Sequence, residues 1–175
     1  MNLADRLVAI HEALDAGGVP HAFGGALALA WCTARPRATI DIDVNLFVKK
    51  ADAAAALGSF PTGVPVSTAT RRAAVEDGQV RLRWDDTPID VFFSTTSFHD
   101  AAQQRVQIKY FAGSGIPFLA CRDLAVFKAF FDRPQDWVDI EKMVSARTID
   151  PAVVADTLAR YVGADDHRVN LLHRM

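Results

Sequence analysis

The segment from Thr39 to Val48 alternates between apolar and polar residues, and this period of two predicts a β-strand with one buried face. Its apolar positions are Ile40, Ile42, Val44, Leu46 and Val48. Asp41 and Asp43 fall on the opposite face, two residues apart, so both carboxylates point to the same side of the sheet. A chain with this strand is expected to form a sheet with one apolar face packed on a core and acidic side chains on the opposite face.

Patterns on either side predict further helices and strands. Leu3–Leu14 has apolar residues at helical spacing, and Gly17-Gly18 after it predicts the end of that helix. Val19–Phe23 predicts a short strand that runs into Gly24-Gly25 and then into helix formers over Ala26–Trp31. The other predictions are a helix over Ala51–Leu57, a hairpin of Gln79–Trp84 with Ile89–Phe93, a helix near Asp100, a strand over Val106–Phe111 and helices from about Arg122. Together they predict an α/β fold, α+β in the stricter sense, with a small mixed β-sheet flanked by helices.

Length and composition predict one globular domain. The chain has 175 residues, of which 50% are hydrophobic and 23% charged, and it has no repeat, low-complexity tract or clear linker. We therefore expect a single domain over residues 1–175, with a core at about 19–120 and a helical C-terminal portion at about 121–175. The formal net charge of -2 argues against a protein whose whole surface binds nucleic acid.

A local basic segment lies in the middle of the chain. Its arginines are Arg71, Arg72, Arg81 and Arg83. We interpret them as a solvated hairpin face, and the alternative is a contact for an anionic acceptor such as RNA.

Asp90 is the third member of a candidate acidic site. It alternates with Ile89, Val91 and Phe93 on a predicted strand, so it can share a sheet face with Asp41 and Asp43. A hard divalent cation relieves the repulsion between such carboxylates, because Mg²⁺ prefers oxygen ligands. The alternative is that the acidic side chains only solvate an exposed sheet face.

The glycine pair Gly24-Gly25 follows a predicted strand and opens a predicted helix. Glycines at such a turn let backbone N–H groups and the helix N-terminus approach a phosphate group. A tight turn with close packing of strand and helix is the other interpretation of the pair.

These residues resemble the nucleotidyltransferases of the DNA polymerase beta superfamily, and among them the AbiEii-type toxin nucleotidyltransferases and their small relatives. The resemblance rests on Gly24-Gly25, on Arg37-x-Thr39-x-Asp41-x-Asp43 and on Ile89-Asp90-Val91. It continues over Ile116-Pro117-Phe118-Leu119, Asp123-Leu124, Lys128, Arg133, Asp136 and Asp139-Ile140. Many members have Gly-Ser where this chain has Gly24-Gly25, so a phosphate contact from a serine hydroxyl is missing here.

The resemblance implies transfer of a nucleoside monophosphate from a nucleoside triphosphate (NTP) to an acceptor hydroxyl. It implies that Asp41, Asp43 and Asp90 bind Mg²⁺, or Mn²⁺ in its place, and that Asp90 also helps to deprotonate the acceptor. It further implies nucleotide binding by Gly24, Gly25, Arg37, Thr39 and Lys128, and a catalytic role for Lys128 together with Asp139.

Lys128 lies toward the apolar face of a predicted helix, close to Leu124 and Phe131. It either reaches inward as a point charge for a donor phosphate or extends its amine outward with its stem on the core. Asp136 and Asp139 are three residues apart on one helix face, where they could orient Lys128 or a substrate group. The alternative is that they are ordinary first-turn aspartates favoured by the helix dipole.

Cys32 and Cys121 are the only cysteines, too few and too far apart in sequence for a disulfide framework or a cysteine zinc site. This pattern favours a reducing compartment, and we expect a cytoplasmic protein. The uncharged stretch from Ala16 to Ala34 contains several glycines and a proline that break a spanning helix, so we expect no membrane segment.

The sequence leaves the acceptor open among transfer RNA, a protein and a small molecule. The resemblance to toxins implies a toxin–antitoxin pair with an antitoxin-like protein partner. The alternative from a different class is a catalytically degenerate transferase fold that acts as a binding module or partner protein.

Overall fold

The computed structural model describes residues 1–36 and 38–175 and divides into two compact units. The sheet unit comprises Met1–Leu27 and Ala38–Leu119, and the helical unit comprises Ala28–Arg37 and Ala120–Met175. The helical unit therefore takes a short segment from the first part of the chain, which the sequence pattern does not indicate.

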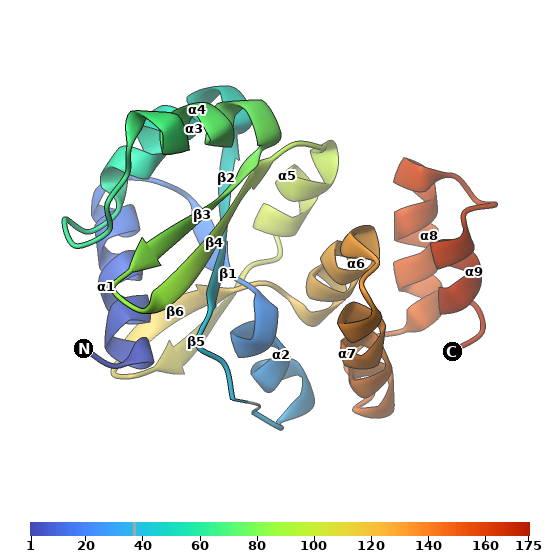
Figure 1. Cartoon of the computed structure of the whole chain (residues 1–175). Helices are drawn as coiled ribbons and strands as arrows, with labels where there is room; N and C mark the ends of the chain where they lie inside the picture. The colour runs from blue at the N-terminus through green and yellow to red at the C-terminus, as the bar shows by residue number, and fades with distance from the viewer. Residues whose placement is uncertain (37) are drawn as a thin grey trace. The chain divides into compact units, whose positions relative to one another are not determined.

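A six-stranded mixed sheet in the order β3-β4-β2-β1-β6-β5 forms the centre of the sheet unit (Figure 1). β2 pairs in parallel with β4, β1 pairs in parallel with β6, and the other neighbouring pairs are antiparallel. The strands are β1 (His21–Phe23), β2 (Ile42–Lys49), β3 (Gln79–Trp84), β4 (Thr87–Ser94), β5 (Gln107–Phe111) and β6 (Ser114–Phe118). This arrangement confirms the predicted α/β fold with its mixed sheet.

Helices pack on this sheet, where α1 contacts β6, α3 contacts β2, α4 contacts β3, and α5 contacts both β2 and β4. Those helices are α1 (Leu3–Ala16), α3 (Ala53–Ala56) between the short 3₁₀ turns η1 (Lys50–Asp52) and η2 (Leu57–Ser59), α4 (Thr68–Asp77) and α5 (Ser97–Gln103). A further helix, α2 (Gly25–Thr33), begins in the sheet unit and ends in the helical unit. The rest of the helical unit consists of α6 (Cys121–Phe131), α7 (Pro134–Ser145), α8 (Pro151–Val162) and α9 (His167–Leu172).

The strand predicted to carry both Asp41 and Asp43 begins later than expected. β2 begins at Ile42, and Ile40 is 70% exposed instead of buried. The hydroxyl of Thr39 accepts a hydrogen bond from the backbone N–H of Asp41 (3.2 Å) and donates one to its carbonyl (3.4 Å). Because a side chain occupies these backbone groups, Asp41 lies just before the strand rather than in its ladder.

Two elements are not predicted by the sequence pattern. α4 is a polar helix with only Ala74 buried, so it lacks the apolar period that marks a core-facing helix. It is set by its ends, since the Ser67 side chain caps its N-terminus and Gly78 adopts the left-handed conformation after it. β6 contains Gly115 and Pro117, which are typical of turns, and it is fixed by pairing with β5 and β1.

The two cysteines form a disulfide, so the expectation of a reducing compartment, which rested on their number and spacing, loses its basis. Cys32 on α2 and Cys121, the first residue of α6, form a disulfide within the helical unit. Their separation of 89 residues along the chain does not prevent contact, because the two helices that carry them belong to the same compact unit. The argument from cysteine spacing for a reducing compartment therefore no longer holds.

Reducing this disulfide is expected to lower the free energy of unfolding by about 2–5 kcal/mol, because the bond closes a long loop in the unfolded chain. Thermal denaturation with and without dithiothreitol measures the effect. The Cys32→Ser variant is the control and should melt at the lower temperature in both buffers. An unchanged melting temperature of the wild-type chain in dithiothreitol contradicts a bond that stabilises the protein.

None of the helices within residues 1–36 and 38–175 combines the length and the apolar character needed to cross a membrane.

Candidate functional site

Three neighbouring strands bring charged residues into one row across the sheet. Asp43 of β2 is in register with Asp90 of β4, and Asp90 is in register with Arg81 of β3. Side chains at paired positions of neighbouring strands point to the same face, so this row, which we call the charged row, lies on one face. The flanking rows are apolar, and Ile42 and Ile89 beside the charged row are fully buried. The structure thus brings together Asp43 and Asp90, as the alternation predicts.

Arg81 binds Asp90 through two hydrogen bonds. Its Nε donates to Oδ1 at 2.6 Å, and an Nη donates to Oδ2 at 2.7 Å, so both carboxylate oxygens are engaged. The hydrogen bond and charge of Asp90 raise the pKa of Arg81 above its usual value, and the charges of Asp41 and Asp43 add to this. Arg81 therefore lies in the field of all three acidic side chains.

The turn before α2 explains why glycine stands at Gly25. Its φ is +55°, and a Cβ at this position would lie 1.8 Å from Oδ2 of Asp43. Gly24 donates its backbone N–H to the carbonyl of Asp43 at 2.9 Å. The glycine turn and the acidic strand are therefore packed directly against each other, and the Asp43 carboxylate lies over the backbone at the N-terminus of α2.

Substituting Gly25 with Ala is expected to displace the Asp43 side chain and to strain the turn. We expect a loss of at least about 1 kcal/mol in the free energy of unfolding, the cost of an unfavourable backbone conformation. Transfer activity per folded molecule should also fall. The matched control is Gly113→Ala. Gly113 also has a positive φ, but a Cβ added there would have no atom within 4 Å, so this variant brings the backbone strain without the clash. Equal activity of the two variants would show that Asp43 does not need its present position.

The donor set of this face suits a hard divalent cation, because it consists of carboxylates alone. Within the part of the chain that the structure describes, no three acidic, histidine or cysteine side chains form a group that could hold a metal ion. Asp90 binds the guanidinium of Arg81 in this arrangement. The face thus has the ligand chemistry for Mg²⁺ or Mn²⁺, and an arginine lies among those ligands.

Lys128 forms a buried ionic cluster in the helical unit. It is 5% exposed, and its Nζ donates to Asp139 at 2.8 Å and to Asp136 at 3.2 Å. Arg133 binds Asp136 at 2.7 Å, and Gln135 donates its amide to Asp139 at 3.0 Å. Lys128 therefore points inward, and the outward orientation that the sequence left open does not occur.

The pKa of Asp136 reflects this cluster. Burial alone would raise it, but hydrogen bonds from Arg133 and the charge and hydrogen bond of Lys128 outweigh burial and lower it below its usual value. The aspartate thus stays ionised and holds α7 to the lysine of α6.

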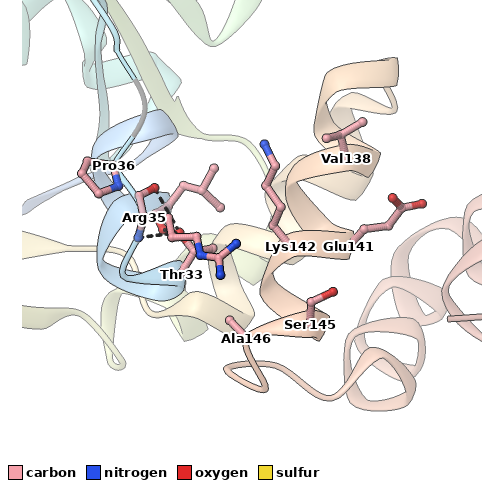
Figure 2. Close-up of a pocket in the computed structure, with 9 residues that line it drawn as sticks. Thr33, Arg35, Pro36, Val138, Glu141, Lys142, Ser145 and Ala146 are labelled. Atoms are coloured by element: carbon pink, nitrogen blue, oxygen red, sulfur yellow. Dashed lines mark hydrogen bonds between the residues drawn. The ribbon is translucent and has the colours of Figure 1, made fainter.

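A pocket of about 600 Å³ lies in the helical unit between the end of α2 and one side of α7 (Figure 2). Thr33, Arg35, Lys142 and Ser145 give it polar groups, and Leu29 and Val138 are among its apolar groups. In Figure 2 the guanidinium of Arg35 points toward α7, whereas the Glu141 carboxylate points away from Arg35.

The remaining predicted residues are placed as follows. Thr39 bonds to the backbone of Asp41, and Arg37 lies outside the described residues. Among the arginines of the basic segment, Arg71 donates to the carbonyl of Ala54 and Arg81 belongs to the charged row. Arg81 belongs to the basic segment identified from sequence, but sequence reasoning missed its pairing with Asp90. A two-residue hairpin loop at Asp85-Asp86 would have placed Arg81 opposite Asp90.

Solved structures with similar folds include the antibiotic-resistance factor ANT(2'')-Ia, with a TM-score of 0.56 and 17% identity over 98% of this chain and 89% of that chain. The lincosamide antibiotic adenylyltransferase LnuA gives a TM-score of 0.56 and 12% identity over 83% of this chain and 98% of that chain. The chain has the nucleotidyltransferase fold. An antigenic nucleotidyltransferase-like protein from Paracoccidioides brasiliensis is also similar, with a TM-score of 0.51 and 15% identity over 95% of this chain and 93% of that chain.

No protein-family model matches the sequence, and no curated protein is significantly similar to it. The predicted nucleotidyltransferase fold is thus supported by structure, while the AbiEii-type subgroup stays a prediction.

Proposed function

We propose that the chain transfers a nucleoside monophosphate from an NTP to an acceptor hydroxyl, with release of pyrophosphate. The observation that carries this proposal is the register of Asp43 with Asp90 on one sheet face, with Asp43 packed on the glycine turn. Acidic side chains beside a helix N-terminus suit a substrate that combines phosphates with a divalent cation.

In the proposed reaction the acceptor oxygen attacks the α-phosphorus, and the bond from that phosphorus to the bridging oxygen breaks, so pyrophosphate leaves. Asp90 takes up the proton of the acceptor hydroxyl. Asp41, Asp43 and Asp90 would hold Mg²⁺ or Mn²⁺, and such an ion, when bound, supplies positive charge to the phosphates. Backbone N–H groups at the start of α2, whose first turn has no acidic residue, bind phosphate oxygens.

The resemblance also assigns roles to residues outside the acidic face. Arg37 and Lys128 neutralise the triphosphate, as the resemblance implies, and Thr39 holds the backbone of Asp41 in place. Asp139, with its hydrogen bond to Lys128, positions the lysine amine. The burial of Lys128 supports this positioning by Asp139 more directly than it supports a contact with phosphate.

A small molecule is the acceptor class that we propose. LnuA is described as a lincosamide antibiotic adenylyltransferase with lincomycin bound, and ANT(2'')-Ia as a complex with adenylyl-2''-tobramycin. A transfer RNA or protein hydroxyl and a toxin role with an antitoxin-like partner are the alternatives that the test below separates.

One observation favours a second function, a catalytically degenerate binding module. Both oxygens of Asp90 are bound by Arg81, so this carboxylate already has a partner. A protein of this kind would bind a partner through its transferase fold without turning over nucleotide.

Nucleotidyl transfer with labelled substrates tests both functions. The purified chain is incubated with each α-labelled NTP, with MgCl₂ or MnCl₂, and with transfer RNA, a protein mixture or a panel of hydroxylated antibiotics. We expect pyrophosphate release and label on a small-molecule acceptor, both lost in Asp41→Asn/Asp43→Asn. If the label appears on transfer RNA or on protein instead, the acceptor belongs to that class and not to the small molecules. The absence of transfer and of pyrophosphate release in every mixture contradicts the enzyme and supports the binding module.

A further inference from the structure

Arg81 combines a strong ionic contact with an exposed position. Its two hydrogen bonds to Asp90 form the bidentate pairing that is most favourable between a guanidinium and a carboxylate. The Asp90 side chain is 21% exposed, whereas that of Arg81 is 59% exposed. Arg81 also lies on β3, an edge strand of the sheet, so its long side chain can leave Asp90 without disturbing the core.

This contact excludes other ligands of Asp90. A carboxylate that accepts hydrogen bonds from a guanidinium at both oxygens cannot give either oxygen freely to a cation, because the two positive charges would lie side by side. When the guanidinium is absent, Asp43 and Asp90 lie in register with Asp41 nearby and repel one another. A positive charge beside Asp90 relieves this repulsion, whether it comes from Arg81 or from a bound cation.

We propose that Arg81 is the resident counter-ion of the charged row, which a divalent cation displaces when it binds to the acidic residues. Arg81 thereby lowers the affinity for the free metal and holds the acidic face together while substrate is absent. This inference rests on the proposed function, because it assumes that Asp41, Asp43 and Asp90 are metal ligands. It makes Arg81 a positioning residue that acts through Asp90.

Arg83 provides a matched control on the same strand. It lies two residues after Arg81 and so on the same face, it is exposed, and it pairs across the hairpin with Pro88 rather than with an acidic residue. Arg83→Gln removes the same charge from the same strand as Arg81→Gln. The difference between the two variants isolates the contact with Asp90 from the general charge of the strand.

Manganese titration, followed by the electron paramagnetic resonance signal of free Mn²⁺, measures the competition without any turnover. We expect Arg81→Gln to bind Mn²⁺ about tenfold more tightly than the wild-type chain, and Arg83→Gln to stay within about twofold of it; tenfold corresponds to about 1.4 kcal/mol. Arg81→Lys keeps the charge but loses the bidentate pairing, so its affinity should lie between those of the wild type and Arg81→Gln.

Melting temperatures provide a second measurement. In EDTA, Arg81→Gln should melt below the wild type and below Arg83→Gln, because its carboxylates repel. Addition of Mn²⁺ should raise its melting temperature more than that of either other protein.

The outcomes separate the two proposals. Equal Mn²⁺ affinity of wild type, Arg81→Gln and Arg83→Gln overturns the role of Arg81 and leaves the metal site in place. Failure of every one of these proteins to bind Mn²⁺, with or without ATP, overturns the metal site of the proposed function and the role of Arg81 with it.

Discussion

Replacement of Asp90 by Asn is expected to leave the protein folded and to lower the rate of transfer by about 10²–10³-fold, the loss typical of removing one group that stabilises developing charge. The amide keeps the shape of the side chain but removes the negative charge and the site that accepts a proton. Steady-state kinetics with the donor NTP and the acceptor, normalised to folded protein, measures the loss. It should appear in kcat more than in KM for the nucleotide.

The control for this substitution is Asp52→Asn. Asp52 is exposed in η1 and makes no side-chain capping hydrogen bond, so its loss should change neither activity nor stability noticeably. If Asp90→Asn turns over within a factor of two of the wild type, Asp90 has no part in the chemistry, and its role is limited to the ion pair with Arg81.

Lys128→Ala should have the largest effect on stability among these substitutions. It leaves the carboxylates of Asp136 and Asp139 buried without their shared ammonium, and breaking such a buried pair costs about 3–5 kcal/mol. For a chain of this length that corresponds to a fall in melting temperature of roughly 6–20 °C. Thermal denaturation gives the fall, and NTP binding at a temperature where the variant is folded gives its effect on the nucleotide.

Lys142→Ala is the matched control for Lys128. Lys142 also faces Asp139, but at 3.8 Å and with a side chain that is 50% exposed, so its removal should cost no more than about 1 kcal/mol. If Lys128→Ala keeps its melting temperature but binds NTP much more weakly, the lysine acts on the triphosphate and not in a packed ion cluster.

The acidic face could be predicted from sequence because apolar residues flank Asp43 and Asp90 at alternate positions, although Phe47 and Phe92 interrupt the alternation further along the strands. Burial of Ile42 and Ile89 next to Asp43 and Asp90 forces the acidic side chains to the other face, whatever the rest of the chain does. The predicted hairpin also occurs, with β3 and β4 close to the predicted bounds. Local alternation was sufficient for these elements.

Other features depend on contacts between residues far apart in the chain, which local patterns do not contain. Cys32 pairs with Cys121 because both residues lie in the helical unit, although they are far apart in sequence. Lys128 is buried because α7 supplies the carboxylates that bind its amine. α4 gives no apolar period because it is mostly exposed. The contact of Arg81 with Asp90 lies between these cases, because it follows from the loop length once the hairpin register is known.

Calorimetric titration of each NTP in the presence of Mg²⁺ is the most direct measurement of the acidic site. The wild-type chain is compared with Asp41→Asn/Asp43→Asn, after thermal denaturation has shown that both are folded. We predict that at least one NTP binds to the wild type only when Mg²⁺ is present, and that the double variant loses this binding. Nucleotide binding that is the same without Mg²⁺, or the same in the double variant, contradicts a metal-dependent nucleotidyltransferase site on this face of the sheet.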